Sequence, residues 1–346
     1  MRYQPTGTPT GGGMGDIIQC TDNHLNRPVV LKMLQDGEED RRLLDEQKAL
    51  IKVRSKHVVQ LYDVIKVTTP SGAKTALVLE HINGSDLTPS SFSPNTAYLK
   101  TIWQISCGLV EIHSEGIIHR DIKPNNIRVN VDGVVKILDF GLARPKGLEA
   151  RTVSIIGTPG YMAPELWGKS TISFDQAIDV YAFGVTALAL ITENVPSELL
   201  QRPPASINNG VLPTLLAGVP HDVIEVIEKC LSYTSADRPC MTDVEETIRR
   251  HLLRGRHRAL LILGSKTHEI NTTSPQATVN VGTLGSMGIA YDGVYFTISS
   301  LSGQVSVNNK VQVIGGELPA CCVMTFGTGR DRKFVTFDVS NPEVTA

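Results

Sequence analysis

Three side chains whose oxygens could bind a metal ion or accept a proton stand at short spacing in the middle of the chain: Asp121, Asn126 and Asp139. Between the second and the third, two apolar runs flank a turn at Asp132-Gly133. This pattern predicts a β-ribbon that brings Asp139 back beside the loop of Asp121. Such a set suits phosphoryl transfer, in which one carboxylate accepts a proton while an amide and a second carboxylate hold magnesium against phosphate oxygens. Turn-capping Asp and Asn residues are the alternative interpretation of either segment alone.

The chain around these residues resembles the eukaryotic-like (bacterial-type) protein kinase family, in its Ser/Thr branch. The motifs that carry the likeness are His-Arg-Asp-x-Lys-Pro-x-Asn at 119–126, Asp-Phe-Gly at 139–141 and Ala-Pro-Glu at 163–165. Their joint order and spacing favour the catalytic interpretation over the turn-capping one. The likeness covers about residues 5–254.

The resemblance implies the α+β, bilobal protein kinase fold. A small β-rich N-lobe would occupy about residues 1–80, a hinge 80–84 and a large helical C-lobe 85–254. Apolar residues recur with helical periodicity at 39–53 and 96–114, which predicts one helix in each lobe.

The resemblance also implies catalytic roles for four residues. Asp121 would accept the proton of the substrate hydroxyl, and Lys123 would steady the transferring phosphate. Lys32, at the end of an apolar strand, would contact the α- and β-phosphates, and Glu46 on the following helix would hold it there. A single Lys on a strand or Glu on a helix is usually a solvated group, so the order of the surrounding motifs supports these roles.

The implied cofactors are ATP and Mg²⁺, with Mn²⁺ as an alternative ion, and the implied metal ligands are Asn126 and Asp139. Three positions depart from the family pattern: Thr10 replaces the first glycine of the glycine-rich loop, Val30 replaces a smaller alanine at the adenine site, and Arg128 replaces an apolar residue under adenine. An arginine there could stack on the base as a cation or could lower nucleotide affinity. The residues implied to contact the nucleotide are Gly12, Gly13, Gly15, Ile17, Val30, Lys32, Glu80, Ile82, Asp86 at the ribose, and Arg128.

The activation segment of the resemblance runs from 141 to 163. Thr158, in Gly-Thr-x-x-Tyr, is expected to hydrogen-bond to Asp121 and Lys123 and to shape the substrate groove, as in Ser/Thr kinases. Thr152 and Ser154 are the implied activation-loop phosphosites, because a phosphate there could bind Arg120 and order the loop. Ordinary polar loop residues are the alternative.

Two further contacts of the resemblance would be structural. Asp179, at the start of an apolar helix, would tie down the backbone of the catalytic loop, although a favourable charge at a helix N-terminus also explains it. Arg238 would pair with Glu165, and breaking that buried pair would cost about 3–5 kcal/mol.

The segment 259–346 has a different residue pattern, with short runs of β-branched residues separated by turns such as Asp292-Gly293 and Gly315-Gly316. This pattern predicts a β-sandwich domain. A forkhead-associated domain, which binds phosphothreonine, is a weak likeness, because Gly329-Arg330 comes too late and no Ser-x-x-His follows it. A protein-contact module of another kind is the favoured interpretation.

Composition excludes several classes of protein. A net charge of −2 at pH 7 disfavours strong nucleic-acid binding, which needs a basic surplus. The six cysteines show no Cys-x-x-Cys spacing, which favours reduced thiols and a cytoplasmic location over disulfides or a zinc site. No leader pattern is evident at the N-terminus, and the most apolar run, 182–191, is shorter than the roughly 20 residues that cross a bilayer. We therefore expect no membrane anchor.

The leading functional hypothesis is an ATP- and Mg²⁺-dependent protein serine/threonine kinase that phosphorylates proteins and its own activation segment. The alternative is a pseudokinase that uses the fold and the C-terminal domain as a scaffold; Thr10 and Arg128 favour it, and the complete set of catalytic residues disfavours it. Phosphorylation of a small molecule is disfavoured by the segment 157–165, which builds a groove for a peptide.

Overall fold

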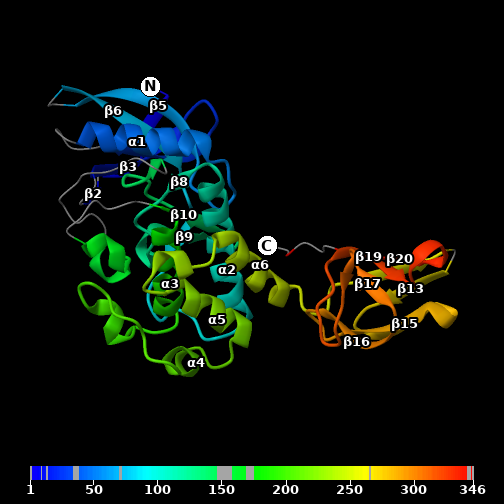
Figure 1. The fold of residues 1–346 in the computed structure, drawn as a ribbon. Coiled ribbons are helices and arrows are strands. Elements are labelled where there is room, and N and C mark those ends of the chain that lie inside the picture. The colour runs from blue at the N-terminus through cyan, green and yellow to red at the C-terminus, as the bar shows by residue number, and fades with distance from the viewer. Residues whose placement is uncertain are drawn as a thin grey trace. The chain divides into compact units, whose positions relative to one another are not determined.

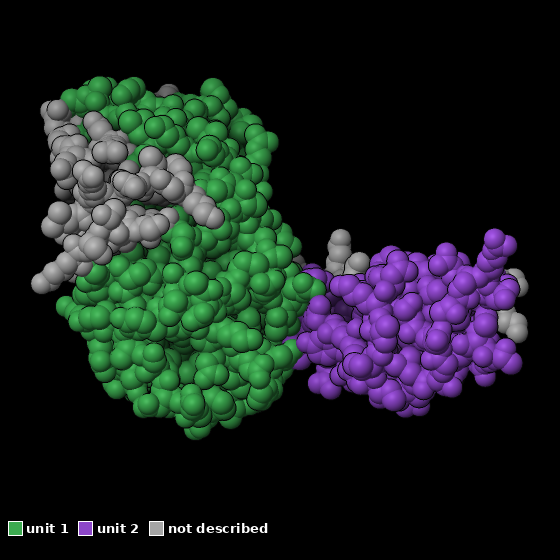
Figure 2. Space-filling model, in the orientation of Figure 1, with its two compact units in different colours: residues 1–248, 346 green, residues 249–345 purple. Residues whose placement is uncertain are grey.

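The structure is a computed structural model. It describes residues 2–8, 10–12, 15–33, 39–69, 72–145, 158–168, 175–264, 266–340 and 344. The chain forms two compact units, residues 1–248 and residues 249–345, which Figure 2 shows in different colours. The division falls within helix α6 (Met241–Leu252), ahead of the junction that the sequence predicts at 254–259.

The first part of unit 1 is an antiparallel sheet, of which Figure 1 labels β2, β3, β5 and β6. Its strand order is β1-β3-β4-β6-β5, and β2 pairs with β3. Its strands are β1 (Tyr3–Pro5), β2 (Thr10–Gly12), β3 (Gly15–Asp22), β4 (Arg27–Met33), β5 (Leu61–Thr69) and β6 (Gly72–Glu80). Alternation along β4 buries Val29 and Leu31 in a small core with Tyr3 and Val78. This sheet is the β-rich lobe that the resemblance implies.

Helix α1 (Glu39–Lys52) belongs to the same lobe and turns one stripe of residues inward. Leu43, Glu46 and Leu50 lie on that stripe at spacings of three and four residues, and all three are buried. A glutamate on an otherwise apolar stripe needs a buried partner, because an isolated carboxylate is costly away from water. Lys32 supplies that partner.

The rest of unit 1 is mainly helical: α2 (Thr96–Ser114), α3 (Ala177–Ala189), α4 (Val211–Leu215), α5 (His221–Cys230) and α6 (Met241–Leu252). Asn95 caps α2, since its Oδ1 accepts a hydrogen bond from Tyr98 N at 3.1 Å. Helix α3 is the centre of this lobe, with nearly all of its side chains buried. None of the helices in the described ranges is long and apolar enough to cross a membrane.

Short strands lie between the sheet and the helices and carry the loops of interest. Strands β7 (Gly84–Asp86), β9 (Ile127–Asn130) and β10 (Val135–Ile137) form a three-stranded sheet in the order β10-β9-β7. Strand β8 (Ile117–Ile118) pairs with β11 (Arg144–Pro145). Gly84 has no room for a side chain, because a Cβ there would collide with the carbonyl of Val129. The close approach of β7 to β9 therefore requires glycine at this position.

Unit 2 consists of a six-stranded sheet, β13-β12-β20-β19-β17-β18, and a three-stranded sheet, β14-β15-β16. The strands are β12 (Ala259–Leu263), β13 (Lys266–Ile270), β14 (Gln276–Asn280), β15 (Gly285–Tyr291), β16 (Phe296–Gly303), β17 (Val305–Val307), β18 (Lys310–Val311), β19 (Cys321–Phe326) and β20 (Lys333–Val339). One core contains residues of both sheets, including Leu261, Ile289 and Phe337. Along β19, Cys321 is exposed and Cys322 is buried, as expected for neighbours on a strand, whose side chains point to opposite faces.

The buried His57 gives the first unit a pH-dependent stability. It is 1% exposed, and its Nδ1 lies 3.1 Å from the Val135 carbonyl oxygen. Burial lowers the pKa of His57 from 6.5 to about 4. The unfolded chain therefore takes up this proton near pH 6.5 and the folded chain only near pH 4, so the free energy of unfolding falls as pH falls through that window.

We expect the wild type to lose about 2–3 kcal/mol more stability than His57→Gln between pH 7 and pH 4.5. Gln can still donate to the Val135 carbonyl but does not titrate. Urea unfolding followed by tryptophan fluorescence measures it, because both tryptophans of the chain, Trp103 and Trp167, lie in unit 1. Equal losses in the two proteins would contradict the assignment.

Candidate active site

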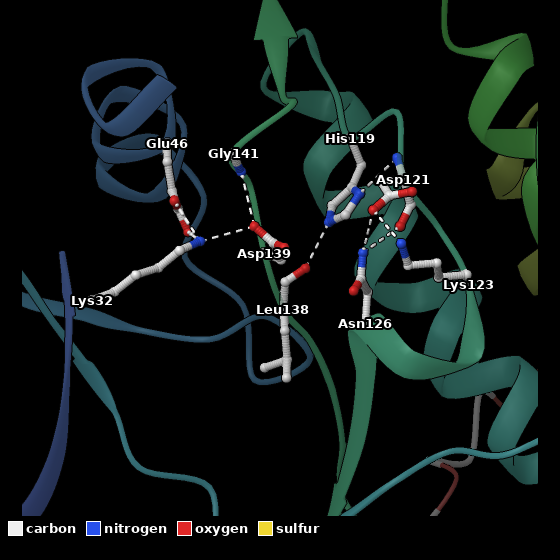
Figure 3. A network of polar contacts seen from close by, with 9 residues as sticks. All are labelled: Lys32, Glu46, His119, Asp121, Lys123, Asn126, Leu138, Asp139 and Gly141. Carbon is white, nitrogen blue, oxygen red and sulfur yellow. Dashed lines mark hydrogen bonds and ion pairs between the residues drawn. The ribbon is translucent and has the colours of Figure 1, made fainter. Parts of the chain in front are cut away.

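The β-ribbon expected between Asn126 and Asp139 is present. Strands β9 and β10 pair antiparallel with Ile127 opposite Ile137. Leu138 N donates to the Asn126 carbonyl at 2.8 Å, which closes the ribbon at its open end. The residue after Leu138 is Asp139, so the ribbon returns this carboxylate to the loop that holds Asp121 (Figure 3).

Asp121 is the centre of a compact polar cluster. Its Oδ2 accepts from Lys123 Nζ at 2.8 Å and from Asn126 Nδ2 at 2.7 Å. Thr158 donates to Asp121 Oδ1 at 3.1 Å and accepts from Lys123 Nζ at 2.7 Å. The contacts expected of Thr158 are thus present, and they fix the Asp121 carboxylate, which is only 4% exposed.

A second cluster joins the two lobes. Lys32 Nζ lies 2.8 Å from both carboxylate oxygens of Glu46 and 2.8 Å from Asp139 Oδ1. Lys32 and Glu46 are buried, while Asp139 is partly exposed. A Cβ on Gly141 would lie 3.2 Å from Asp139 Oδ1, so glycine at this position avoids a tight contact with the carboxylate.

The charged groups of this cluster shift one another's pKa values. Burial by itself would lower the pKa of Lys32, but Glu46 and Asp139 outweigh it and raise that pKa above its usual value. Burial raises the pKa of Glu46, and Lys32 offsets this only in part. Burial would also raise the pKa of Asp139, yet the Lys32 charge prevails and lowers it. Lys32 and Asp139 are therefore charged at neutral pH.

His119 connects the two clusters, a role that the sequence did not assign to it. Its Nδ1 accepts from Asp121 N at 3.3 Å, and its Nε2 therefore carries the proton and donates to the Leu138 carbonyl at 2.9 Å. The ring also packs edge-on against Phe140, with 4.7 Å between centroids. The position of His119 next to Asp121 in the motif could have suggested a role for it, but its hydrogen-bond partners are known only from the fold.

Asp179 anchors the loop from below, which confirms the expected contact. This fully buried carboxylate accepts from His119 N and Arg120 N at 2.8 Å each and lies 3.0 Å from His113 Nε2. Burial would raise the pKa of Asp179, but these donors lower it, so the anchor stays ionised. The anchor holds Arg120 at φ +72°, and Asp139 has φ +60°. Such a backbone conformation costs about 1–3 kcal/mol in a residue other than glycine and is common at functional sites.

Two side-chain oxygens of the site, on Asn126 and Asp139, remain available to bind a divalent cation. Asn126 uses its amide nitrogen on Asp121, which leaves Oδ1 without a hydrogen bond among the described residues. Asp139 uses Oδ1 on Lys32 and Gly141 and keeps Oδ2. An amide oxygen and a carboxylate oxygen are hard ligands of the kind that Mg²⁺ prefers. No cluster of three or more His, Cys, Asp or Glu that could hold a metal occurs in the described part of the chain. Of the residues described here, Asn126 and Asp139 offer one oxygen each, and phosphate or water oxygens are of the same hard type.

The expected nucleotide-contacting residues lie around this site to different degrees. In the hinge, Ile82 is 6% exposed, and its N–H and C=O make no hydrogen bond to any described residue. Val30 pairs with Leu79 and Ile17 with Lys32 on the strands above it. Gly12 and Gly15 pair where β2 turns into β3. Gly13, Thr152 and Ser154 lie outside the described residues.

Three charged residues near the hinge have partners that the sequence did not predict. Glu80 binds Lys136 Nζ through Oε2 at 2.8 Å, and the lysine is buried. Asp86 lies 3.1 Å from Arg128, between carboxylate Oδ1 and guanidinium Nε. The sequence placed Asp86 at the ribose and left the role of Arg128 open.

A family model described as the protein kinase domain matches residues 9–248. The chain belongs to the protein kinase family. The match confirms the resemblance and the bilobal kinase fold, whereas the forkhead-associated likeness of the C-terminal segment stays a prediction.

Named relatives agree with the family. The serine/threonine-protein kinases drp72 of Corynebacterium efficiens are 32% identical over 197 residues, 54% of this chain and 38% of the relative. Serine/threonine-protein kinase PknL of Mycobacterium tuberculosis is 30% identical over 255 residues, 68% of this chain and 62% of the relative. MAP3K epsilon protein kinase 2 of Arabidopsis thaliana is 30% identical over 234 residues, 65% of this chain and 16% of the relative. The chain thus spans less than two thirds of the length of each of these relatives.

Proposed function

We propose that this kinase-family chain is an active protein serine/threonine kinase, which transfers the γ-phosphoryl of ATP to a Ser or Thr hydroxyl. The observation that carries the proposal is that Asp121 meets Asn126 and Asp139, which flank the open end of one β-ribbon, and that Lys32 is bound to Asp139. This arrangement supplies the base, the metal ligands and the phosphate cation that the reaction needs.

The chain's own residues divide the work. Asp121 accepts the proton of the attacking hydroxyl, and Lys123 and Thr158 hold its carboxylate in place. Lys32, fixed by Glu46, binds the phosphates of the nucleotide. Asn126 and Asp139 would hold Mg²⁺ or Mn²⁺, which would supply positive charge next to the phosphates.

Nucleotide contacts come from the residues around the hinge and the first strands. Ile82 offers its backbone N–H and C=O to the base, and the Glu80 side chain is held away by Lys136. The backbone of Gly12 and Gly15, which pair between β2 and β3, approaches the phosphates. Autophosphorylation at Thr152 or Ser154, the activation-loop sites that the resemblance implies, is part of the proposal.

The experiment is transfer of label from ATP in the presence of magnesium, with wild type beside Asp139→Asn. We expect label on a generic protein substrate or on the protein itself, and a loss of about 10²–10³-fold in Asp139→Asn, because one metal ligand loses its charge. Asp132→Asn, an exposed carboxylate on the turn of the same β-ribbon, is the matched control and should retain activity.

A wild-type protein that binds nucleotide and labels nothing would contradict the proposal and leave the scaffold interpretation. Label on a small molecule but on no protein would contradict the substrate class. Both outcomes are separable from misfolding, because unfolding can be followed on Trp103 and Trp167.

For the C-terminal segment we propose a β-sandwich that contacts a protein partner. The support is the single core that both of its sheets share. A cytoplasmic location is also part of the proposal and is supported by the six free cysteines.

A further inference from the structure

Arg128 occupies the middle of the path between the hinge and the metal ligands. Asn126 precedes it by two residues, and at the other end of β9 Val131 N donates to the Asn83 carbonyl at 2.9 Å. Each step of two residues along a strand is about 6–7 Å. A nucleotide with its base at the hinge and its phosphates at Asn126 must therefore lie over Arg128.

The partner of Arg128 is on the neighbouring strand. Asp86 of β7 stands directly opposite Arg128 in the antiparallel register, so both side chains lie on the same face of the sheet. The 3.1 Å contact between Arg128 Nε and Asp86 Oδ1 draws the guanidinium across the sheet towards β7 and not along β9 towards Asn126. The side chains are 35% and 51% exposed, so the pair is open to a ligand.

The other neighbour of Arg128 does not compete for Asp86. Lys136 of β10 lies opposite Arg128 on its other side, but its ammonium is bound to Glu80 at 2.8 Å. The row Asp86, Arg128, Lys136 thus contains two cations, each with its own carboxylate. Asp86 and Arg128 form a separate unit.

We propose, on the basis of the proposed function, that Asp86 and Arg128 act as one nucleoside-binding element. Arg128 presents the planar face of its guanidinium to the base, and Asp86 is the positioning residue that keeps this plane flat on the sheet. A planar cation attracts an aromatic ring, and a fixed guanidinium loses little conformational freedom on binding. The element contacts the nucleoside part of the ligand and not its phosphates.

This role predicts non-additive effects of substitution. Asp86→Asn releases Arg128 from its carboxylate, and Arg128→Gln leaves the Asp86 charge unpaired beneath an anionic nucleotide. Each change alone disables the whole element, whereas the two together leave a neutral pair in which no charge has lost its partner. Residues that act as a unit couple in this way.

The test measures equilibrium binding of ADP and of adenosine by calorimetry to the wild type, the two single variants and the double variant. We expect each single substitution to weaken both ligands about tenfold. We expect the double variant to bind no more weakly than the weaker single variant. Adenosine should lose as much as ADP, because the element lies under the nucleoside.

Three results would overturn the inference. Losses that multiply in the double variant would mean that the residues act separately. A loss for ADP alone would place Arg128 at the phosphates, and tighter binding by Arg128→Gln would make the pair an obstruction. Arg27→Gln is the matched control, since Arg27 is 33% exposed and also near an aspartate, Asp22, which keeps Arg2 as a partner; its binding should be unchanged.

Failure of the proposed function gives a different result. A wild type that binds ADP and adenosine but transfers no phosphate would refute the kinase activity and leave the coupling measurement valid. Unchanged binding in all variants of an active enzyme would refute the coupling and leave the kinase activity.

Discussion

Asp121→Asn is expected to lower kcat by about 10²–10⁴-fold, the usual contribution of a positioned general base. The amide has nearly the same shape as the carboxylate. In the wild type, Lys123 and Asn126 donate to Asp121 Oδ2 at 2.8 and 2.7 Å. The amide oxygen of the variant can still accept both hydrogen bonds, and its NH₂ can donate to the Thr158 hydroxyl. The fold and the nucleotide site should therefore remain, while the group that takes the substrate proton is lost.

The measurement compares kcat with the affinity for ADP. Because only the base is removed, kcat should fall while ADP affinity stays within about twofold of the wild type. Asp237→Asn, an exposed carboxylate elsewhere in the same lobe, should change neither quantity. If Asp121→Asn kept more than about a tenth of the wild-type kcat, Asp121 would not be the base.

Arg238→Ala is expected to destabilise unit 1 by about 3–5 kcal/mol. The Arg238 side chain is fully buried. NH1 and NH2 bind the two Glu165 oxygens at 2.7 and 2.8 Å, and the remaining donors reach the carbonyls of Ser232, Ala177 and Tyr233. Truncation removes the donors to these carbonyls and leaves Glu165 without its cation. The contact itself confirms the pairing that the sequence predicted.

Urea unfolding followed by tryptophan fluorescence measures this loss. Arg238→Lys should recover little of it, since an ammonium has three donors and no planar fork for the carboxylate. Glu225→Ala is the control, because its pair with His221 is an exposed contact within one helix and should contribute less than about 0.5 kcal/mol. A similar loss in Arg238→Ala and Glu225→Ala would mean that the buried network contributes no more than a surface pair.

The local motifs predicted much of the site because their residues are close in sequence. Asp121, Lys123 and Asn126 belong to one loop, and the turn at Asp132-Gly133 is enough to predict that Asp139 returns to it. Periodicity likewise indicated α1 and α2, since a stripe of apolar residues must face a core. The pairing of Lys32 with Glu46 and of Arg238 with Glu165 came from the resemblance, because residues that far apart meet only through the fold.

Other features were invisible in the sequence for the same reason. His119 donates a hydrogen bond to the Leu138 carbonyl, and Arg120 and Asp139 have positive φ. These features depend on backbone positions that cannot be predicted from residue type. The pairing of Asp86 with Arg128 requires the register of β7 against β9, which brings together a residue that follows the hinge and one that follows the catalytic loop.

The sequence by itself determined the chemistry, since residue types and short spacings decide which groups can accept a proton, hold a cation or bind phosphate. Tertiary structure alone decided how those groups are charged and held. Burial and long-range neighbours set the pKa of Lys32 and Asp139, and strand register chose the partner of Arg128. These quantities depend on distances between distant parts of the chain, and such distances exist only after folding.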